Sequence, residues 1–322
     1  MNEKMKILIG YDGSDCSEAA LDDLLKAGLP QSDVEAQVLS VADVFMLPSP
    51  PPSSYEIVEA ATEAGARAID RRRYATNVQA MEAAEEFARR AGERLRNNFP
   101  AWDVRTEATN ASPAWELVAR ADAWKPDLVV VGSHGRSALG RFVMGSVSQR
   151  VLTEARCSVR VARGRVEVDQ TPARIIVGVD GSPGSEAAVR AAAARRWPLN
   201  SEARVIVVQD PVVPTVIDHI IPPVATRMAE VNESETEWLQ KIAGGAAERL
   251  TSNGLVVSST IMSGDPKRVL VEEAERWGAD CIFVGSMGFS NRVERFLIGS
   301  VSSAVAARAH CSVEVVREQK AE

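Results

Sequence analysis

KILIGYDGSDCSEAA, residues Lys6–Ala20, returns in closely similar form as RIIVGVDGSPGSEAA, residues Arg174–Ala188. In both copies an apolar run with the character of a buried strand ends in Asp-Gly-Ser, and a helical pattern follows. A second pair of segments is repeated in the same way: GSHGRSALGRFVMGSVS at Gly132–Ser148 and GSMGFSNRVERFLIGSVS at Gly285–Ser302. Two repeats in the same order indicate that one α/β unit occurs twice in this chain.

Apolar stretches that indicate strands alternate with helical patterns, and the order is the same in both halves. The expected strands of the first half are Lys6–Gly10, Val34–Val41, Asp103–Thr109, Asp127–Val131 and Ser158–Val161. Those of the second half are Arg174–Val179, Arg204–Gln209, Val256–Ile261, Asp280–Val284 and Ser312–Val316. Continuous apolar strands separated by helices predict a parallel sheet covered by helices on both faces.

The 322 residues are enough for about two domains, since a domain has roughly 150 residues. The repeat divides the chain into domains at 1–163 and 173–322, with a short charged linker between them. The first half is longer between its first and fourth strands, and the surplus is expected around Pro48–Arg73. That stretch contains the loop PSPPPSS at Pro48–Ser54 and the basic run Arg71–Arg73, whose roles the sequence leaves open.

The formal net charge of −7 argues against a general binder of nucleic acid or of anionic membranes. No apolar run approaches the length of a membrane span, and no signal peptide precedes the first strand, so a cytoplasmic location is expected. None of the four cysteines forms a CxxC motif or a cluster with histidine, which argues against a metal site. Cys157 and Cys311 hold the same place before the last strand of each half, and we expect buried thiols there.

The repeated motifs are expected to meet at one edge of each sheet. Asp12 and Asp180 directly follow the first strands, while the Gly-rich segments Gly132–Gly145 and Gly285–Gly299 follow the fourth strands. In an open parallel sheet the ligand crevice lies beyond the carboxyl ends of the strands. Each half therefore predicts one site at its carboxyl edge, formed by an acidic turn and a Gly-rich loop.

The Gly-rich segment suits a chain of phosphates. Glycine lets backbone N–H groups approach oxygen atoms closely, and the helix that begins at Gly145-Ser146 offers unpaired N–H groups and a favourable dipole to an anion. The hydroxyls of Ser146 and Ser148 are available to donate further hydrogen bonds. The carboxylate of Asp12 suits a ribose hydroxyl, a donor on the adenine side or a bound cation. A Gly-rich turn between strand and helix can also serve chain geometry alone, and this alternative stays open.

Gly132, Gly135, Gly145 and Ser146 match the signature G-x2-G-x9-G-S/T without a gap, and on these residues the chain resembles the universal stress protein family in its tandem two-domain form. The resemblance extends over nearly all of both halves. It implies two Rossmann-like α/β domains, each with a five-stranded parallel sheet in the order 3-2-1-4-5 and helices on both faces. It also implies that the domains associate as a pseudo-dimer through the edges of their fifth strands, while a homodimer of the whole chain stays open.

The resemblance further implies ATP binding, which occurs in many members of the family and is absent from others. In the first half the implied site residues are Gly10, Asp12, Val41, Gly132, Gly135, Gly145, Ser146, Val147 and Ser148. In the second half they are Gly178, Asp180, Val208, Gly285, Gly288, Gly299, Ser300, Val301 and Ser302. Ten residues rather than nine separate Gly288 from Gly299, so the second half departs from the signature and is expected to bind ATP more weakly.

The sequence therefore predicts an ATP-binding stress or signalling module, with or without Mg²⁺ on the ATP. No GxxxxGKS/T or GxSxG motif occurs, and no catalytic residue is assigned. Ser14 and Ser182 are interpreted as helix N-caps rather than nucleophiles, and His134 as a surface side chain of the loop. Two alternatives stay open: a nucleotide-free scaffold for an unidentified protein partner, and a slow ATPase or phosphotransfer enzyme, for which the sequence shows no clear general base.

Overall fold

The computed structural model describes residues 4–43, 63–135, 144–163, 172–209, 222–287 and 298–318, so Pro48–Ser54 and Gly288 lie outside the described residues. The first half contains β1 (Met5–Gly10), α1 (Asp15–Lys26), β2 (Val34–Ala42), α2 (Glu63–Asn98), β3 (Asp103–Asn110), α3 (Pro113–Trp124), β4 (Leu128–Gly132), α4 (Ser146–Glu154) and β5 (Ser158–Ala162). The second half contains β6 (Arg174–Val179), α5 (Pro183–Ala193), β7 (Glu202–Gln209), α6 (Pro222–Thr251), β8 (Val256–Ser263), α7 (Pro266–Trp277), β9 (Cys281–Gly285), α8 (Ser300–Arg308) and β10 (Ser312–Val316).

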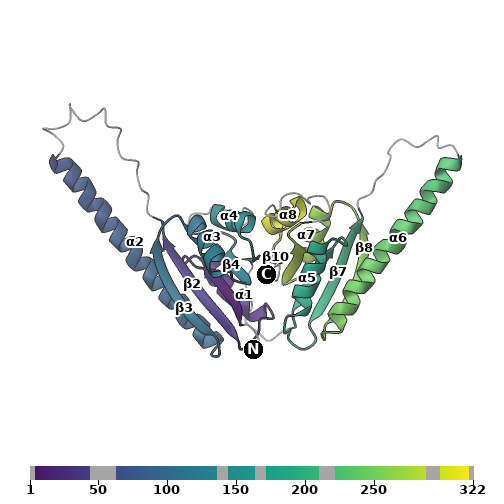
Figure 1. The fold of residues 1–322 in the computed structure, drawn as a ribbon, viewed down its shortest axis with the longest axis horizontal. Coiled ribbons are helices and arrows are strands. Elements are labelled where there is room, and N and C mark those ends of the chain that lie inside the picture. The colour runs from purple at the N-terminus through teal and green to yellow at the C-terminus, as the bar shows by residue number, and fades with distance from the viewer. Residues whose placement is uncertain are drawn as a thin grey trace.

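The strands of the described chain form one sheet of ten, in the order β3-β2-β1-β4-β5-β10-β9-β6-β7-β8 (Figure 1). Within each half the neighbouring strands are parallel, in the order that the family resemblance implies. The two halves do not form separate sheets, however, because β5 and β10 pair in antiparallel fashion. The inference that the fifth strands associate through their edges is confirmed, and its consequence is a single continuous sheet.

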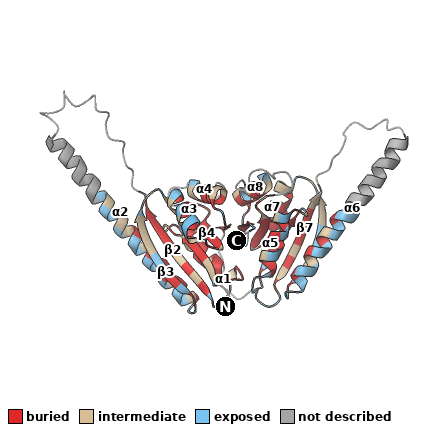
Figure 2. Cartoon of the chain, in the orientation of Figure 1, coloured by how far each residue is buried: buried red, intermediate tan, exposed pale blue. Residues whose placement is uncertain are grey.

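Helices cover both faces of this sheet. On one face α3, α4, α7 and α8 share a single apolar core that runs through both halves and includes Cys157 and Cys311, as expected. Burial raises the pKa of these two thiols to about 11 and about 12. On the opposite face α1 and α2 enclose one core, and α5 and α6 enclose another. Figure 2 shows the buried residues on the strands and on the helix sides that face them. The apolar core on one face of the sheet is therefore continuous across the junction of the halves, whereas the core on the other face is divided into two.

The long helices show part of the difference in length between the halves. α2 is one helix of 36 residues and α6 has 30. In Figure 1 both run along the outer sides of the molecule, where α2 packs on β2 and β3 and α6 packs on β7 and β8. Part of the surplus expected around Pro48–Arg73 therefore lies in the longer α2, which has no break.

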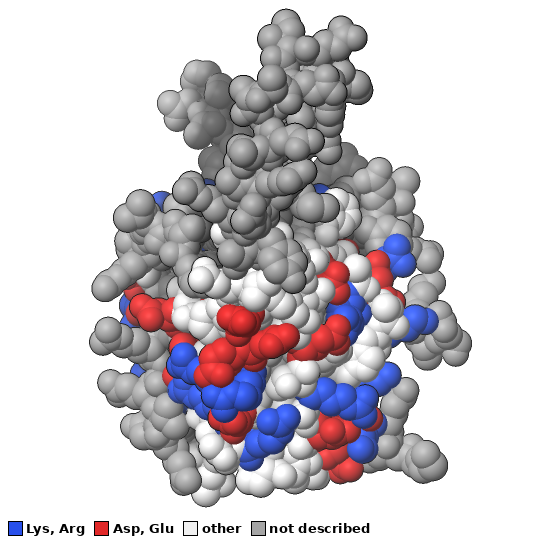
Figure 3. Space-filling model, turned by 90° about the vertical axis from the view of Figure 1, so that its left-hand side faces the viewer, with Lys and Arg blue, Asp and Glu red and all other residues white. Residues whose placement is uncertain are grey.

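The outer surface of the first half mixes both signs of charge, as Figure 3 shows. Arg89 pairs with Glu86 and Glu93 along α2, and Arg105 pairs with Asp103 on β3. Exposed pairs of this kind contribute little to stability, because water and salt screen them. None of the helices in the described ranges has both the length and the apolar character of a membrane span.

The acidic turns lead directly into α1 and α5. Ser14 and Ser182 are the N-caps, and each side chain accepts a hydrogen bond from an amide in the first turn of its helix. The N-cap interpretation is therefore confirmed. Gly13 and Gly181, which precede the caps, have φ angles of 74° and 78°, a conformation that glycine adopts without strain. Each first strand thus continues into a capped helix after a very short turn.

Candidate functional site

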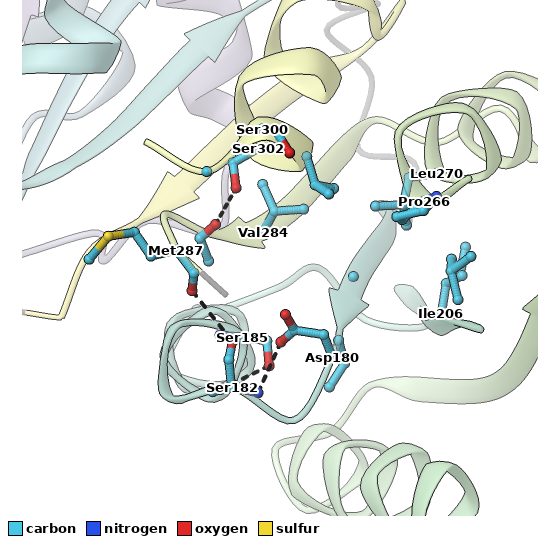
Figure 4. A pocket seen from close by; sticks show the side chains of 16 residues that line it. Asp180, Ser182, Ser185, Ile206, Pro266, Leu270, Val284, Met287, Ser300 and Ser302 are labelled. Atoms are coloured by element: carbon cyan, nitrogen blue, oxygen red, sulfur yellow. Dashed lines mark hydrogen bonds between the residues drawn. The ribbon is translucent and has the colours of Figure 1, made fainter. Parts of the chain in front are cut away.

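A cavity of about 350 Å³ opens at the carboxyl ends of the strands in the second half (Figure 4). Pockets for small molecules have volumes of roughly 300–1,000 Å³. The one predicted residue of this half that is missing from the lining, Gly288, lies outside the described residues. The predicted residues that do line the cavity are Gly178, Asp180, Val208, Gly285, Gly299, Ser300, Val301 and Ser302.

One wall of the cavity is apolar. Ile206 and Val208 come from β7, Leu270 from α7 and Val284 from β9. Gly178 lies against this wall, because a β-carbon there would lie 3.1 Å from Cδ1 of Leu270. The absence of a side chain at the end of β6 therefore leaves space beside an apolar surface.

Sequence analysis missed three residues of this wall, Ile206, Leu270 and Val284. The repeat contained a signal for one of them, because Leu117 holds the place in α3 that Leu270 holds in α7. Gly10 lies against Leu117 in the same way, with a β-carbon position 3.0 Å from its Cδ1. Nothing in the pattern of β7 distinguished Ile206 from the other apolar residues of that strand.

The acidic turn supplies a polar side of the cavity. Oδ1 of Asp180 accepts a hydrogen bond from the N–H of Ser182 at 2.9 Å, which Figure 4 shows as a dashed line. In the first half, Oδ1 of Asp12 accepts from the N–H of Ser14 at 3.0 Å and from its hydroxyl at 2.6 Å. These local bonds hold each carboxylate in a turn at the edge of the sheet. A carboxylate held there can accept a hydrogen bond from a ligand hydroxyl.

The helices α4 and α8 begin at this edge without a side-chain cap. Gly145 and Gly299 are the N-cap residues, and among the described residues neither helix start has a side-chain capping hydrogen bond. The N–H of Gly145 donates to the carbonyl of Ser133 at 2.8 Å, and the N–H of Gly299 donates to that of Ser286 at 2.6 Å. The N–H groups of the following turn have no carbonyl partner within the helix. Together with the helix dipole they make each start a favourable place for an anion.

The hydroxyls of Ser148 and Ser302 are already bonded within the protein. Ser148 Oγ donates to the carbonyl of Gly132 at 2.6 Å, and Ser302 Oγ donates to that of Gly285. Both serines are buried. The expectation that the Ser148 hydroxyl is available to a ligand is therefore wrong, because it joins the first turn of α4 to the end of β4. Ser146, by contrast, is exposed at the helix start.

Gly132 and Gly285 have a packing role that sequence analysis raised only as an alternative. A β-carbon on Gly132 would lie 2.7 Å from the carbonyl carbon of Cys16, and one on Gly285 would lie 2.3 Å from that of Gly184. Backbone this close leaves no room for a side chain. These first glycines of the motif therefore allow α1 and α5 to pack against the ends of β4 and β9.

The first half brings its predicted residues to the matching edge. Gly10 and Val41 lie at the carboxyl ends of β1 and β2, which pair in parallel. A β-carbon on Gly135 would lie 3.0 Å from Oδ2 of Asp12, and one on Gly145 would lie 3.6 Å from the amide nitrogen of Gly135. The acidic turn and the glycines of the motif are thus neighbours in space. The first turn of α4 at this edge contains Ser146, Val147 and Ser148.

His134 is buried, which corrects the expectation of a surface side chain. It is 8% exposed, and its Nδ1 lies 2.9 Å from Oγ of Ser133 and 4.0 Å from Sγ of Cys16. Burial, and after it the positive charge of Arg163, lowers the pKa of this imidazole. Met287 holds the matching place in the second half and is half-buried, so this position does not require an ionisable group.

Comparison with known proteins identifies relatives over both halves. A family model described as the universal stress protein family matches residues 4–163 and 172–317. The universal stress protein Rv2005c of Mycobacterium tuberculosis is 31% identical over 220 residues, which are 67% of this chain and 69% of the relative. A universal stress protein of Mycolicibacterium smegmatis is 33% identical over 225 residues, which are 66% of this chain and 69% of the relative.

Solved structures share the arrangement of the whole chain. A universal stress protein from Archaeoglobus fulgidus superimposes with a TM-score of 0.60 at 20% identity, over 97% of this chain and 98% of that chain. The functionally unknown protein PA1789 from Pseudomonas aeruginosa superimposes with a TM-score of 0.58 at 14% identity, over 98% and 92% of the two chains. At these identities the likeness supports the fold alone.

Proposed function

Because this chain belongs to the universal stress protein family, we propose that it is a nucleotide-responsive module with one ATP site in each half. The observation that carries the proposal is the cavity of the second half, whose lining contains eight residues expected from the sequence. We extend the assignment to the first half, whose expected residues lie at the matching edge. The two sites belong to the segments 1–163 and 173–322, which we propose as the two domains.

The lining of the cavity fits the three parts of a nucleoside triphosphate. An adenine ring needs an apolar surface, which Ile206, Val208 and Leu270 offer. A ribose hydroxyl needs an acceptor, and Asp180 belongs to the same lining. A triphosphate needs N–H donors and a positive potential, which the uncapped helix start at Gly299 offers.

In the first half we assign the same parts to the equivalent residues. Val41 and Leu117 would contact the adenine, Asp12 the ribose, and the segment Gly132–Gly145 with the start of α4 the phosphates. Gly135 supports this assignment, because a β-carbon there would lie 3.0 Å from Oδ2 of Asp12 and crowd the space beside it. Mg²⁺ usually binds nucleotides through phosphate oxygens and one or two carboxylates, and we propose the same for any Mg²⁺ that accompanies the ATP.

We propose that ATP is a ligand of this protein rather than its substrate. The edge of the sheet offers an apolar wall, N–H donors and the carboxylate of Asp180, whose Oδ1 is engaged by Ser182. Such groups bind and orient a nucleotide. We further propose that the protein works in the cytoplasm, where ATP is abundant. A partner protein would then bind the ATP-occupied form and the ATP-free form with different affinity.

The test uses the full chain purified under native conditions. Ligand released by denaturation is identified by mass spectrometry, and stripped protein is titrated with ATP in a calorimeter, with and without Mg²⁺. We expect an adenine nucleotide in the released fraction and saturable binding at two sites. The double variant Gly145→Val/Gly299→Val should lose binding and keep its circular dichroism spectrum.

The matched control is Gly244→Val, since a β-carbon at Gly244 on α6 meets nothing within 4 Å. It should bind ATP as the wild-type chain does. Folded, stripped wild-type protein that does not bind ATP would contradict the proposal and favour the scaffold. Release of phosphate during prolonged incubation would instead identify a slow ATPase.

A further inference from the structure

Arg160 of β5 and Glu314 of β10 face each other where the two halves join. The antiparallel register places them directly opposite, with a pair of valines on either side. Each is only 1% exposed, and Nη1 of Arg160 donates to Oε2 of Glu314 at 3.1 Å. A buried ion pair therefore lies at the centre of an otherwise apolar strand pair.

The two residues also hold the same place in the internal repeat. SVRVA at Ser158–Ala162 corresponds to SVEVV at Ser312–Val316, so Arg160 and Glu314 are equivalent positions. The pseudo-twofold axis that relates the halves must then pass between these two side chains. In the same register, two first halves would oppose arginine to arginine, and two second halves would oppose glutamate to glutamate.

Each of these buried charges is also held by a partner from its own half. Asp23 of α1 accepts from Arg160 through both oxygens, at 2.5 Å from Nε and 2.9 Å from Nη2. Arg195, just after α5, donates to Oε1 of Glu314 at 2.5 Å. The four side chains form one chain of alternating charges, which lies where the core of this face is divided.

The holding partners differ between the halves together with the central pair. Ala191 stands in the second half at the position of Asp23, and Ala27 stands in the first half at the position of Arg195. In the first half the central arginine is thus paired with an aspartate, and in the second half the central glutamate is paired with an arginine. The difference involves three equivalent positions, two of which carry a charge in each half.

One pair of arginines makes the same kind of contact across the junction in both directions. Arg163 and Arg317 are equivalent in the repeat, and each donates to carbonyl groups at the end of the facing helix, α8 and α4 respectively. Two identical halves could make these bonds equally well. The valines beside the central pair also do not distinguish one half from the other, because apolar contacts carry no charge.

We propose that the Arg160–Glu314 pair selects the partner of each fifth strand. β5 pairs with a fifth strand that carries glutamate at this position, as β10 does, and β10 pairs with one that carries arginine, as β5 does. A buried charge opposite a like charge loses its hydrogen bond and the opposite charge that compensates it, which is costly at a site shielded from solvent. The partner is therefore the other half of the same chain. When two chains associate through these edges, each half binds the complementary half of the second chain and not a copy of itself.

The first test is a cycle of substitutions in the full chain. The first-half exchange, Asp23→Ala/Ala27→Arg/Arg160→Glu, and the second-half exchange, Ala191→Asp/Arg195→Ala/Glu314→Arg, each give one half the charges of the other and so place like charges opposite one another. The two exchanges together restore opposite charges in reversed order, each with its partner from its own half. We expect each exchange alone to lower the thermal midpoint and the two together to regain at least half of the summed loss. A combined variant as unstable as the sum of the two losses would overturn the proposal. Arg163→Met and Arg317→Met, also buried but not in contact with each other, are the control pair whose losses should add.

The second test measures partner choice directly. A chain with the first-half exchange and a chain with the second-half exchange are co-expressed with different tags, and the masses of the complexes are measured by native mass spectrometry. We expect a one-to-one complex of the two variants in at least tenfold excess over dimers of either variant alone, because exchange of halves restores opposite charges at both junctions. Recovery of the variants as separate monomers, as a statistical mixture of dimers, or not at all would overturn the proposal.

Discussion

Oγ of Ser148 donates a 2.6 Å hydrogen bond to the carbonyl of Gly132, and this bond joins the first turn of α4 to the end of β4. Ser302 and Gly285 make the same connection in the second half. The strand end and the helix start are the two fixed ends of the Gly-rich motif. The bond therefore sets the separation of the two backbone segments that we propose as phosphate ligands.

Ser148→Ala should lower the free energy of unfolding by about 1–3 kcal/mol, because it leaves a buried carbonyl without this donor. Urea denaturation of the full chain measures the change. The matched control is Thr153→Ala, which removes an exposed hydroxyl bonded to the carbonyl of Gln149 and should cost less than about 0.5 kcal/mol. Equal losses of unfolding free energy in the two variants would show that the bond to Gly132 contributes no more to stability than an exposed hydrogen bond does.

Gly132→Ala should destabilise the fold by about 1–3 kcal/mol, the usual cost of forcing extra volume into packed structure. The new β-carbon would lie 2.7 Å from backbone atoms of Cys16, which cannot move without displacing α1. Gly145→Ala is the comparison within the same motif, because its β-carbon would have its nearest neighbour at 3.4 Å. Gly132→Ala should therefore be the less stable of the two variants. Denaturation curves in which Gly145→Ala is the less stable one would refute the packing role of Gly132.

The second site should bind ATP more weakly than the first. The segment Phe289–Ile298 has one residue more than the signature allows, and a lost charge-assisted hydrogen bond costs roughly 1.5–3 kcal/mol, or about tenfold to a hundredfold in affinity. Calorimetry on Gly299→Val reports the first site and on Gly145→Val the second. Deletion of Asn291 should tighten the second site; equal affinities before the deletion would show that the longer loop carries no penalty.

Stability should fall as the pH drops through the range in which His134 titrates. Burial and Arg163 lower the pKa of His134 in the folded chain, whereas the unfolded chain takes up the proton near about pH 6.5. The unfolded state then binds more protons, so acidification below that pH favours unfolding. His134→Met should reduce the difference in unfolding free energy between about pH 7.5 and about pH 5.5. An unchanged difference in His134→Met would contradict the assignment.

Val159→Lys together with Val313→Lys should loosen the two halves, since both valines are fully buried at the junction of β5 and β10. A buried ammonium group has no partner there and costs more than the strand pairing can offset. Faster cleavage within Arg163–Pro172 by a protease is the expected readout. Val256→Lys, at a valine that is 60% exposed on β8, is the control. Cleavage at the wild-type rate in the double variant would mean that the edges do not hold the halves together.

Much of the fold could be predicted because it depends on patterns within short segments. The apolar run before Asp12 and its copy before Asp180 mark strands, and the serine caps that follow need only the adjacent turn. The candidate site followed from the same logic, because parallel strands bring the residues after their ends to one edge. Ile206, Leu270 and Val284 were missed because they join the lining only through the packing of their strands and helix in the sheet and against it.

The sequence by itself determined the repeat, the strands and the place of the motifs, since these depend on periodicity and turn chemistry between near neighbours. Only the tertiary structure decided how the polar side chains of the motifs and of the junction are buried and with which residues they pair. His134 is buried and Ser148 bonds inward because of segments that the motif does not contain. Asp23, bonded to a serine 289 positions away at Ser312, belongs to a network that exists only after both halves fold and join. Burial and ion pairing depend on distance in space, and no local pattern encodes a distance between segments so far apart in the chain.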